Sequence, residues 1–202
     1  MFLQVQKYNY FFRNKNNTSF LLVFLLFYVD LQIMRQIVYG FSDSPFGHII
    51  VARTWEGICD LQFLDYNRLE TIHQLAKRWG VYTPTTQNDT MAQTVERVIF
   101  EGYDHPLKLD IKGTDFQLRV WNEVQKVQFG HTATYLDIAK GIGEPKAVRA
   151  VATAIAQNPI AMLIPCHRII HSDGTTGEYH WGKELKQQLI DWEKDSLLNA
   201  QK

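Results

Sequence analysis

The sequence contains very little cysteine. Only Cys59 and Cys166 occur among its 202 residues, far apart, and neither belongs to a C-x-x-C pair or another metal-type spacing. We therefore expect no zinc site. Counting alone leaves open a single disulfide between the two cysteines. A secreted chain of this length usually carries more of them, however, so a reducing compartment is favoured.

The chain also lacks net charge and a long apolar segment. It has 21 basic and 21 acidic side chains, so no overall field indicates nucleic acid or an anionic membrane, although a local patch stays open. The apolar run FLLVFLLFYV at 20–29 falls short of the roughly 20 residues that a membrane-spanning helix needs, so no membrane partner is expected. With 46% hydrophobic and 21% charged residues, the composition is typical of one globular domain or two small ones.

Residues 1–33 form a leader of doubtful status. They are rich in Phe, Tyr, Asn and Lys, which codons made of A and T alone can encode, so one interpretation is a mis-assigned start ahead of Met34. The alternatives are a packed extension or a targeting segment, although no A-x-A-like cleavage site follows the apolar run. We favour the first interpretation and expect no chemistry from this segment.

Residues 34–113 show strand patterns mixed with helical ones. Two apolar runs around Ser-Asp-Ser-Pro within 36–54 predict a hairpin, and 57–65 predict a third strand that buries Cys59 as a small apolar residue. Apolar spacing predicts helices at 67–80, between an Asn cap and Gly80, and at 91–103. The stretch 83–90 is polar and contains turn-forming residues. The segment LKLDIKG at 107–113 predicts another strand. A small α/β domain is expected here, within an α+β chain.

Residues 114–202 are expected to be a mostly helical domain. Apolar residues share one face of a helix at 115–127, and short helices at 134–143 and 146–158 flank a Gly-Glu-Pro turn, which outlines a helix-turn-helix. The second of these is rich in alanine, with Arg149 as its only full charge after Lys146. Small side chains permit either close packing of another helix or entry into a DNA groove, and the pattern leaves both open. A mild excess of basic residues from 108 to 168 suits DNA.

The segment IPCHRII at 164–170 places Cys166 between a proline and a histidine, with Arg168 next. A thiol becomes a strong nucleophile as its thiolate, which nearby positive charge or a base promotes. His167 is the adjacent base, Glu193 is a candidate to orient a histidine, and Asn158 is a candidate hydrogen-bond donor near the thiol. Neighbours on a strand point to opposite faces, so adjacency alone does not establish contact.

Taken together, these motifs resemble the 6-O-alkylguanine-DNA alkyltransferases, also called methylated-DNA–protein-cysteine methyltransferases. The resemblance rests on YLDIAKGIGEPKAVRAVATAIAQNP, then PCHR, then GEYHWG, and spans about 116–193. It implies that residues 34–113 form a ribonuclease-H-like domain, and that the protein repairs duplex DNA once per molecule without a cofactor. The second N-terminal cysteine that the family's zinc-binding members use is lacking, which also argues against zinc. The cysteine-rich metal domain of the family's regulators is lacking too, which argues against a transcriptional role.

The same resemblance implies roles for individual residues. Cys166 would accept the alkyl group, His167 would act as a base through a water and be held by Glu193, Asn158 would bridge toward the thiol, and Tyr135 would donate to the leaving guanine. Arg149 would replace the extruded nucleotide, with its helix in the minor groove. The other DNA contacts implied are Ala147, Val148, Ala152, Ile155 and Ser172. The pocket would be walled by Ile169, Thr176, Tyr179 and His180.

Three other functions remain as alternatives. A non-catalytic protein of the same fold would bind the lesion, although such proteins commonly carry Trp where this chain has Cys166. A plain helix-turn-helix regulator would use Cys166 only as a buried thiol. A cysteine hydrolase would need an oxyanion hole that the sequence does not place. Double-stranded DNA with alkylated guanine is the expected partner, no obligate protein partner is expected, and the expected location is the bacterial cytoplasm, at the nucleoid, or the eukaryotic nucleus.

Overall fold

The first described segment forms the predicted hairpin. The computed structural model describes residues 36–64, 68–79 and 85–200, so the leader at 1–33, the Asn67 cap and the Gly80 stop lie outside the described residues. Strand β1 (Ile37–Ser44) pairs antiparallel with β2 (Gly47–Arg53), and Gly47 has the positive φ of 109° that favours glycine in the turn. Strand β3 (Ile58–Phe63) adds antiparallel to β2, as predicted.

The sheet is completed by a strand that the sequence did not reveal. Strand β4 (Thr85–Gln87) pairs parallel with β1, which gives the order β3-β2-β1-β4. It lies in the stretch 83–90, whose polar residues gave no strand pattern. The expected strand at 107–113 is wrong. The segment makes only an isolated bridge at Leu109, opposite Ile58: the amide of Ile58 donates to the carbonyl of Lys108 at 2.7 Å, and the amide of Asp110 donates to the carbonyl of Ile58 at 2.8 Å. Ile58 is the first residue of β3, and the chain soon turns into a helix capped by Thr114.

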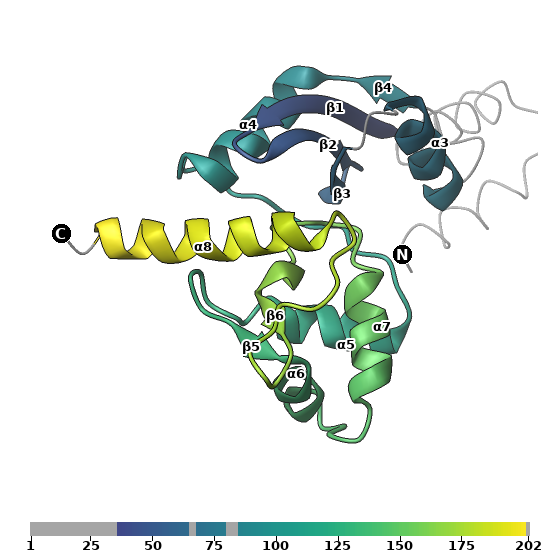
Figure 1. Cartoon of the computed structure of the whole chain (residues 1–202). Helices are drawn as coiled ribbons and strands as arrows, with labels where there is room; N and C mark the ends of the chain where they lie inside the picture. The colour runs from purple at the N-terminus through teal and green to yellow at the C-terminus, as the bar shows by residue number, and fades with distance from the viewer. Residues whose placement is uncertain (1–35, 65–67, 80–84, 201–202) are drawn as a thin grey trace, which may run out of the picture.

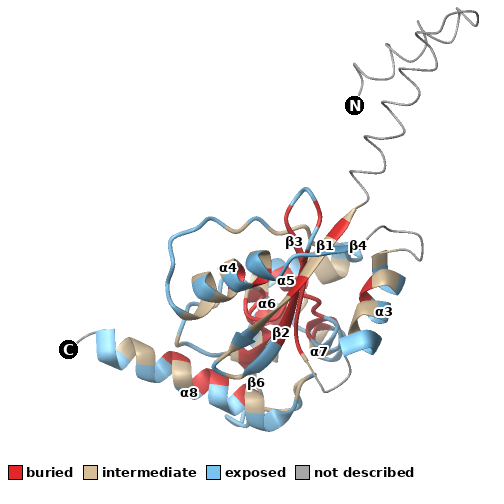
Figure 2. Ribbon diagram, turned by 90° about the horizontal axis from the view of Figure 1, so that it is seen from above, coloured by how far each residue is buried: buried red, intermediate tan, exposed pale blue. Residues whose placement is uncertain are grey.

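Both faces of the sheet are covered, which explains why β2 carries an unbroken apolar run. Helix α3 (Arg68–Trp79) places Leu75 against Ile50, Ala52 and Cys59 on one face. Helix α4 (Asp89–Phe100), capped by Asn88, packs on the other face, where Ile49 and Val51 also join the core of the second half. Figure 2 shows α3 and α4 on opposite sides of the strands.

The second half is helical around a small core. Helices α5 (Asp115–Val124), α6 (Tyr135–Gly141) and α7 (Val148–Ala156) pack together, and the indole of Trp121 donates to the carbonyl of Ala154 at 2.8 Å. The α5 and α6 caps are capping boxes from Thr114 and Thr134. Helices α6 and α7 form the predicted helix-turn-helix pair, but α5 and α7 are shorter than the sequence suggested.

The remaining elements bring the two halves together. A short 3-10 helix η1 (Cys166–Arg168) leads into strand β6 (Ile169–Ile170), which pairs parallel with β5 (Ala133–Thr134), and helix α8 (Lys183–Ala200) runs along the border between the sheet and the helices (Figure 1). The result confirms the α+β class, with a small sheet unit followed by a helical one. Among the described helices, none is long and apolar enough to cross a membrane.

Candidate active site

Asn158 organises the segment that carries the cysteine. It lies two residues after α7 ends, and its buried side chain bonds several groups of the segment that follows. Its amide nitrogen donates to the carbonyl of Ile164 at 2.8 Å and to the sulfur of Cys166 at 3.1 Å, while its oxygen accepts from the amide of Ile160 at 3.0 Å. One side chain therefore fixes both the loop and the hydrogen bond to the thiol.

Cys166 is free and almost completely buried, at 5% exposure, on the first residue of η1. Burial raises the pKa of its thiol, because a thiolate is poorly solvated there, while the Asn158 hydrogen bond and the positive charge of Lys186 oppose that rise. The thiol is thus protonated at rest, and the Asn158 hydrogen bond and Lys186 reduce the cost of forming the thiolate.

The histidine that follows the cysteine in sequence is buried together with a carboxylate. The Nε2 atom of His167 lies 2.8 Å from Oε1 of Glu193. Burial lowers the pKa of His167, only partly offset by Glu193, so we assign a neutral ring that donates from Nε2 and leaves Nδ1 as an acceptor. That Nδ1 is buried without a hydrogen-bond partner among the described residues, so it is the ring atom left able to accept a hydrogen bond.

Arg168 and Gly130 complete the surroundings of Glu193. The guanidinium donates to both carboxylate oxygens at 2.9 to 3.1 Å and to the carbonyl of Val127 at 2.6 Å, and the amide of Gly130 donates to Oε2 at 2.9 Å. Burial by itself would raise the pKa of Glu193, but its bonds to His167 and Arg168 lower it on balance. The carboxylate therefore stays charged and holds the histidine ring in one orientation.

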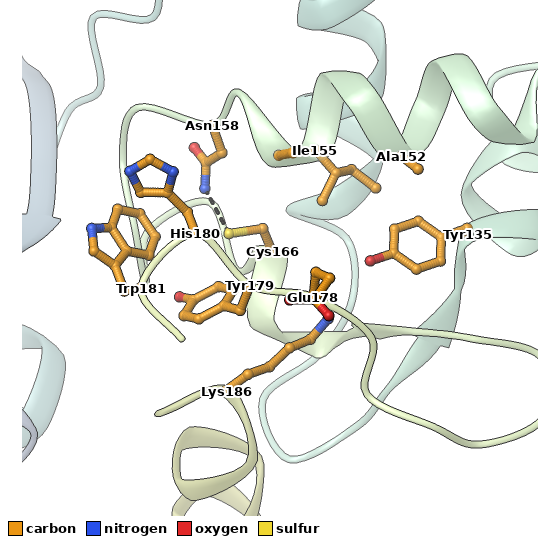
Figure 3. A pocket seen from close by; sticks show the side chains of 11 residues that line it. Tyr135, Ala152, Ile155, Asn158, Cys166, Glu178, Tyr179, His180, Trp181 and Lys186 are labelled. Atoms are coloured by element: carbon orange, nitrogen blue, oxygen red, sulfur yellow. Dashed lines mark hydrogen bonds between the residues drawn. The ribbon is translucent and has the colours of Figure 1, made fainter. Parts of the chain in front are cut away.

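The thiol opens onto a cavity of about 200 Å³ that is lined by α6, α7, the segment with Asn158 and Cys166, the loop before α8, and α8 itself. Helix α6 contributes Tyr135, whose hydroxyl points toward Cys166 in Figure 3, and the loop before α8 contributes Tyr179 and its neighbours. Burial raises the pKa of Tyr135, so its phenol keeps its proton as a donor. The residues that line the cavity are Tyr135, Ala152, Ile155, Ala156, Asn158, Cys166, Glu178, Tyr179, His180, Trp181 and Lys186.

Two residues expected in the pocket wall are not part of it. Ile169 is fully buried in the core, and its carbonyl rather than its side chain serves the site, by accepting from Nζ of Lys186 at 2.6 Å. Thr176 is not among the lining residues either. In contrast, Ala152 and Ile155, expected to contact DNA, line the cavity, because α7 forms one of its walls.

Lys186 is the main residue that sequence reasoning missed. Its side chain is buried, lines the cavity, and has its pKa lowered to about 8 by burial. It lies 20 positions after Cys166, on a different helix, and no short motif links the two. A lysine among the apolar positions of α8, between Leu185 and Leu189, was the only signal available.

The other residues expected at the DNA lie at the surface of the same half. Arg149 is exposed on α7, Ala147 precedes the helix as its half-buried cap, Val148 is half-buried, and Ser172 is exposed in the loop after β6. The exposed face of α7 therefore lies beside the cavity wall formed by Ala152 and Ile155.

Comparison with known proteins places this geometry in a family. Residues 115–195 match the family described as 6-O-methylguanine DNA methyltransferase, DNA binding domain, and residues 37–110 match its ribonuclease-like domain. A methylated-DNA–protein-cysteine methyltransferase of Methanosarcina barkeri is 36% identical over 166 residues, which cover 79% of this chain and 98% of the relative. The Mycobacterium tuberculosis OGT crystallised with DNA is 32% identical, with a TM-score of 0.64 over 78% of this chain and 93% of that one.

Other relatives are longer than the matched region. The Escherichia coli bifunctional transcriptional activator/DNA repair enzyme Ada is 38% identical over 156 residues, covering 75% of this chain but 44% of the relative. The chain spans about half the length of several curated relatives that it matches. The relatives covered almost end to end nevertheless share both halves of this fold, and the chain belongs to the methylated-DNA–protein-cysteine methyltransferase family.

Proposed function

We propose that the protein repairs DNA by moving an alkyl group, mainly methyl, from the O6 atom of guanine in a duplex to Cys166. The observation that carries this proposal is the cavity beside α7, in which the thiol bonded to Asn158 is backed by the His167–Glu193 pair. A nucleophile, a base and an oriented carboxylate stand in sequence there, and the cavity is of a size to receive an alkylated base.

The transfer is a single displacement. The sulfur attacks the alkyl carbon in line, and the bond from that carbon to the guanine oxygen breaks with its electron pair left on guanine. The thiol proton passes toward Nδ1 of His167 through a water, and guanine gains a proton with the help of the Tyr135 hydroxyl. The products are a thioether and neutral guanine. Because a thioether has no easy leaving route, each molecule acts once and needs no cofactor.

Duplex DNA is engaged through α7 and its neighbours. The target oxygen lies inside the helix, so the nucleotide must be flipped out at a cost of a few kcal/mol, which a damaged pair reduces. Arg149, exposed on α7, takes the vacated space in the stack, while Ala147, Val148 and Ser172 lie against the backbone. Ala152 and Ile155 then guide the flipped base into the cavity that they line. We place the protein with the DNA, in the bacterial nucleoid or the eukaryotic nucleus, and without an obligate protein partner.

The test is mass analysis of the intact protein after incubation with a duplex that contains 6-O-methylguanine. We expect the mass of one methyl group added per molecule, on the peptide with Cys166 and not on the one with Cys59. Cys166→Ser should bind the duplex without any gain in mass.

Each alternative function gives a different result in this experiment. Binding of the damaged duplex without a mass change would identify a lesion-recognition protein, and equal binding of undamaged duplex would identify a regulator. Catalytic release of product beyond one equivalent would point to a hydrolase and contradict the proposal.

A further inference from the structure

One side chain separates the reactive cavity from a second one. Trp181 lines the 200 Å³ cavity that contains Cys166, and it also lines a cavity of about 320 Å³ at the border between the two halves. The second cavity takes its other walls from the hairpin, from β3 and from the start of α8, including Phe46, Phe63 and Gln188. In Figure 3, Trp181 lies on the side of the reactive cavity opposite Tyr135.

The indole is held in place by ring contacts. The centroid of the Phe63 ring lies 5.8 Å from that of Trp181 at an interplanar angle of 71°, and Tyr179 and His180 contact it at 5.2 and 4.9 Å, also edge to face. Tyr179 and His180 belong to the same loop as Trp181 and directly precede it in sequence. Phe63 is the contact that comes from the other half of the molecule.

Phe63 is itself firmly supported. It ends strand β3 and is 6% exposed within the main core. Two residues earlier, the amide of Leu61 donates to the carbonyl of Pro159 at 3.0 Å, and its carbonyl accepts from the amide of Ala161 at 2.8 Å. Strand β3 is thus hydrogen-bonded to the segment that carries Asn158. Its last residue, Phe63, is therefore held in a fixed position against Trp181.

We infer that Phe63 is a positioning residue that sets the size of the alkyl group accepted at Cys166, an inference that rests on the proposed function. With Phe63 in place, Trp181 stands in the wall, and the reactive cavity suits a small group such as methyl. When Phe63 is shortened, the indole moves back toward the second cavity and leaves room for a bulky, aromatic alkyl group. A cavity needs only about 10–15 Å³ to hold one water, so a second cavity of about 320 Å³ has room for a displaced ring.

The experiment compares transfer rates from duplexes that carry 6-O-methylguanine and 6-O-benzylguanine. In Phe63→Leu, which keeps an apolar side chain but removes the ring that contacts Trp181, we expect the ratio of the benzyl rate to the methyl rate to rise on the order of tenfold, the equivalent of one lost aromatic contact. Both rates come from one sample, so partial loss of folding lowers them together and leaves the ratio unchanged.

Matched variants separate this effect from general loosening. Phe100→Leu alters an aromatic cluster with Phe46 and Trp192 but lines neither cavity, so its ratio should equal that of the wild type. Adding Gln188→Trp to Phe63→Leu fills the second cavity and should return the ratio toward the wild-type value. Adding Gln187→Trp, one position away and outside the lining, should not.

The outcomes distinguish the inference from the function on which it rests. An unchanged ratio in Phe63→Leu, with methyl transfer intact in the wild type, would overturn the role of Phe63 and leave the repair function standing. A rise that Gln188→Trp fails to reverse would overturn the use of the second cavity. Absence of methyl transfer in the wild type would instead overturn the proposed function.

Discussion

Each half of the molecule buries one thiol and one acid paired with an arginine, yet the two sets differ in what surrounds them. In the sheet half, Cys59 is 2% exposed, and the neighbouring Asp60 is buried against Arg78. In the helical half, Cys166 is 5% exposed, and Glu193 is buried against Arg168. Burial raises the pKa of both thiols. Burial alone therefore does not distinguish a nucleophile from a core residue.

The neighbours make the difference. At Cys59 the carboxylates Asp60 and Asp110 raise the thiol pKa further, with Lys112 and Arg78 opposing them, and the residue lines neither of the two cavities described above. Cys166 has an amide donor, a buried lysine and a cavity. Carboxylates add to the rise of the thiol pKa at Cys59, whereas at Cys166 an amide donor opposes that rise beside a cavity, which is the physical basis for expecting chemistry only at Cys166.

The largest expected difference comes from neutralising the two buried acids. The side chain of Arg168 is 13% exposed and depends on Glu193 for its charge partner. The side chain of Arg78 is 40% exposed, so water still solvates its guanidinium. Removing one partner of a buried pair costs about 3–5 kcal/mol, so Glu193→Gln should lower the free energy of unfolding by that amount and slow transfer as well. Asp60→Asn should cost far less, because burial already disfavours its charged form.

Denaturant unfolding of both variants, with transfer rates measured on the same samples, checks this pair. Equal losses of stability would mean that the exposure of the arginine does not decide the cost. Slowed transfer in Asp60→Asn would show that the acid of the sheet half takes part in the site.

The contrast between the halves also explains how much the sequence predicted. In the sheet half, two apolar runs around the Ser-Asp-Ser-Pro turn predicted β1 and β2, and the apolar positions at 57–65 predicted β3, because strand and turn patterns are local properties of the sequence. Strand β4 is only three residues long and polar, so its pairing with β1 depends on tertiary contact rather than on its own pattern. The segment 107–113 has the local pattern of a strand, but it meets β3 only at that strand's first residue, Ile58, so no ladder forms.

In the helical half, motifs located Cys166, Asn158 and His167, because these residues are close in sequence. Lys186 and Trp181 were missed as parts of the site, because only the folding of α8 and its preceding loop against η1 brings them to the cavity. The second cavity behind Trp181 was likewise beyond reach, since it forms between elements from both halves.

A middle-sized effect is expected from two exposed arginines, one in each half. Arg149→Ala on α7 should slow transfer from a methylated duplex by about tenfold, the equivalent of about 1.4 kcal/mol, because less of the cost of base flipping is offset. Transfer from the free modified base, which needs no flipping, should be nearly unchanged. Arg97→Ala on α4 is the matched control and should change neither rate.

Single-turnover rates with both substrates decide the outcome. Equal losses with duplex and free base would place Arg149 in the reaction pocket or in the fold rather than at the extruded nucleotide. An Arg97→Ala defect confined to the duplex would extend the DNA contact into the sheet half.

The last expected difference is the opposite response of the two buried acids to pH. Burial raises the pKa of Asp60 from 3.8 to about 7, despite the opposing influence of Arg78 and Gln62, so the folded state holds the extra proton between these values. The stability that this group contributes is fully present below about pH 4 and is lost as the pH rises through 7. The pKa of Glu193 is lowered below its ordinary 4.5, so its contribution is present above that value and is lost as the pH falls.

The free energy of unfolding measured from pH 4 to pH 8 in the wild type and in Asp60→Asn isolates the first of these contributions. His167, whose lowered pKa makes stability rise with pH over part of this range, contributes equally to both proteins and cancels in the difference. We expect the wild type to lose stability relative to the variant as the pH rises from 4 to 7, with a slope of at most about 1.4 kcal/mol per pH unit, since one proton is involved. Asp104→Asn, in an exposed loop of the same half, serves as control and should run parallel to the wild type. A difference that grows as the pH falls would mean that Arg78 outweighs burial at Asp60, and the acids of the two halves would then be alike.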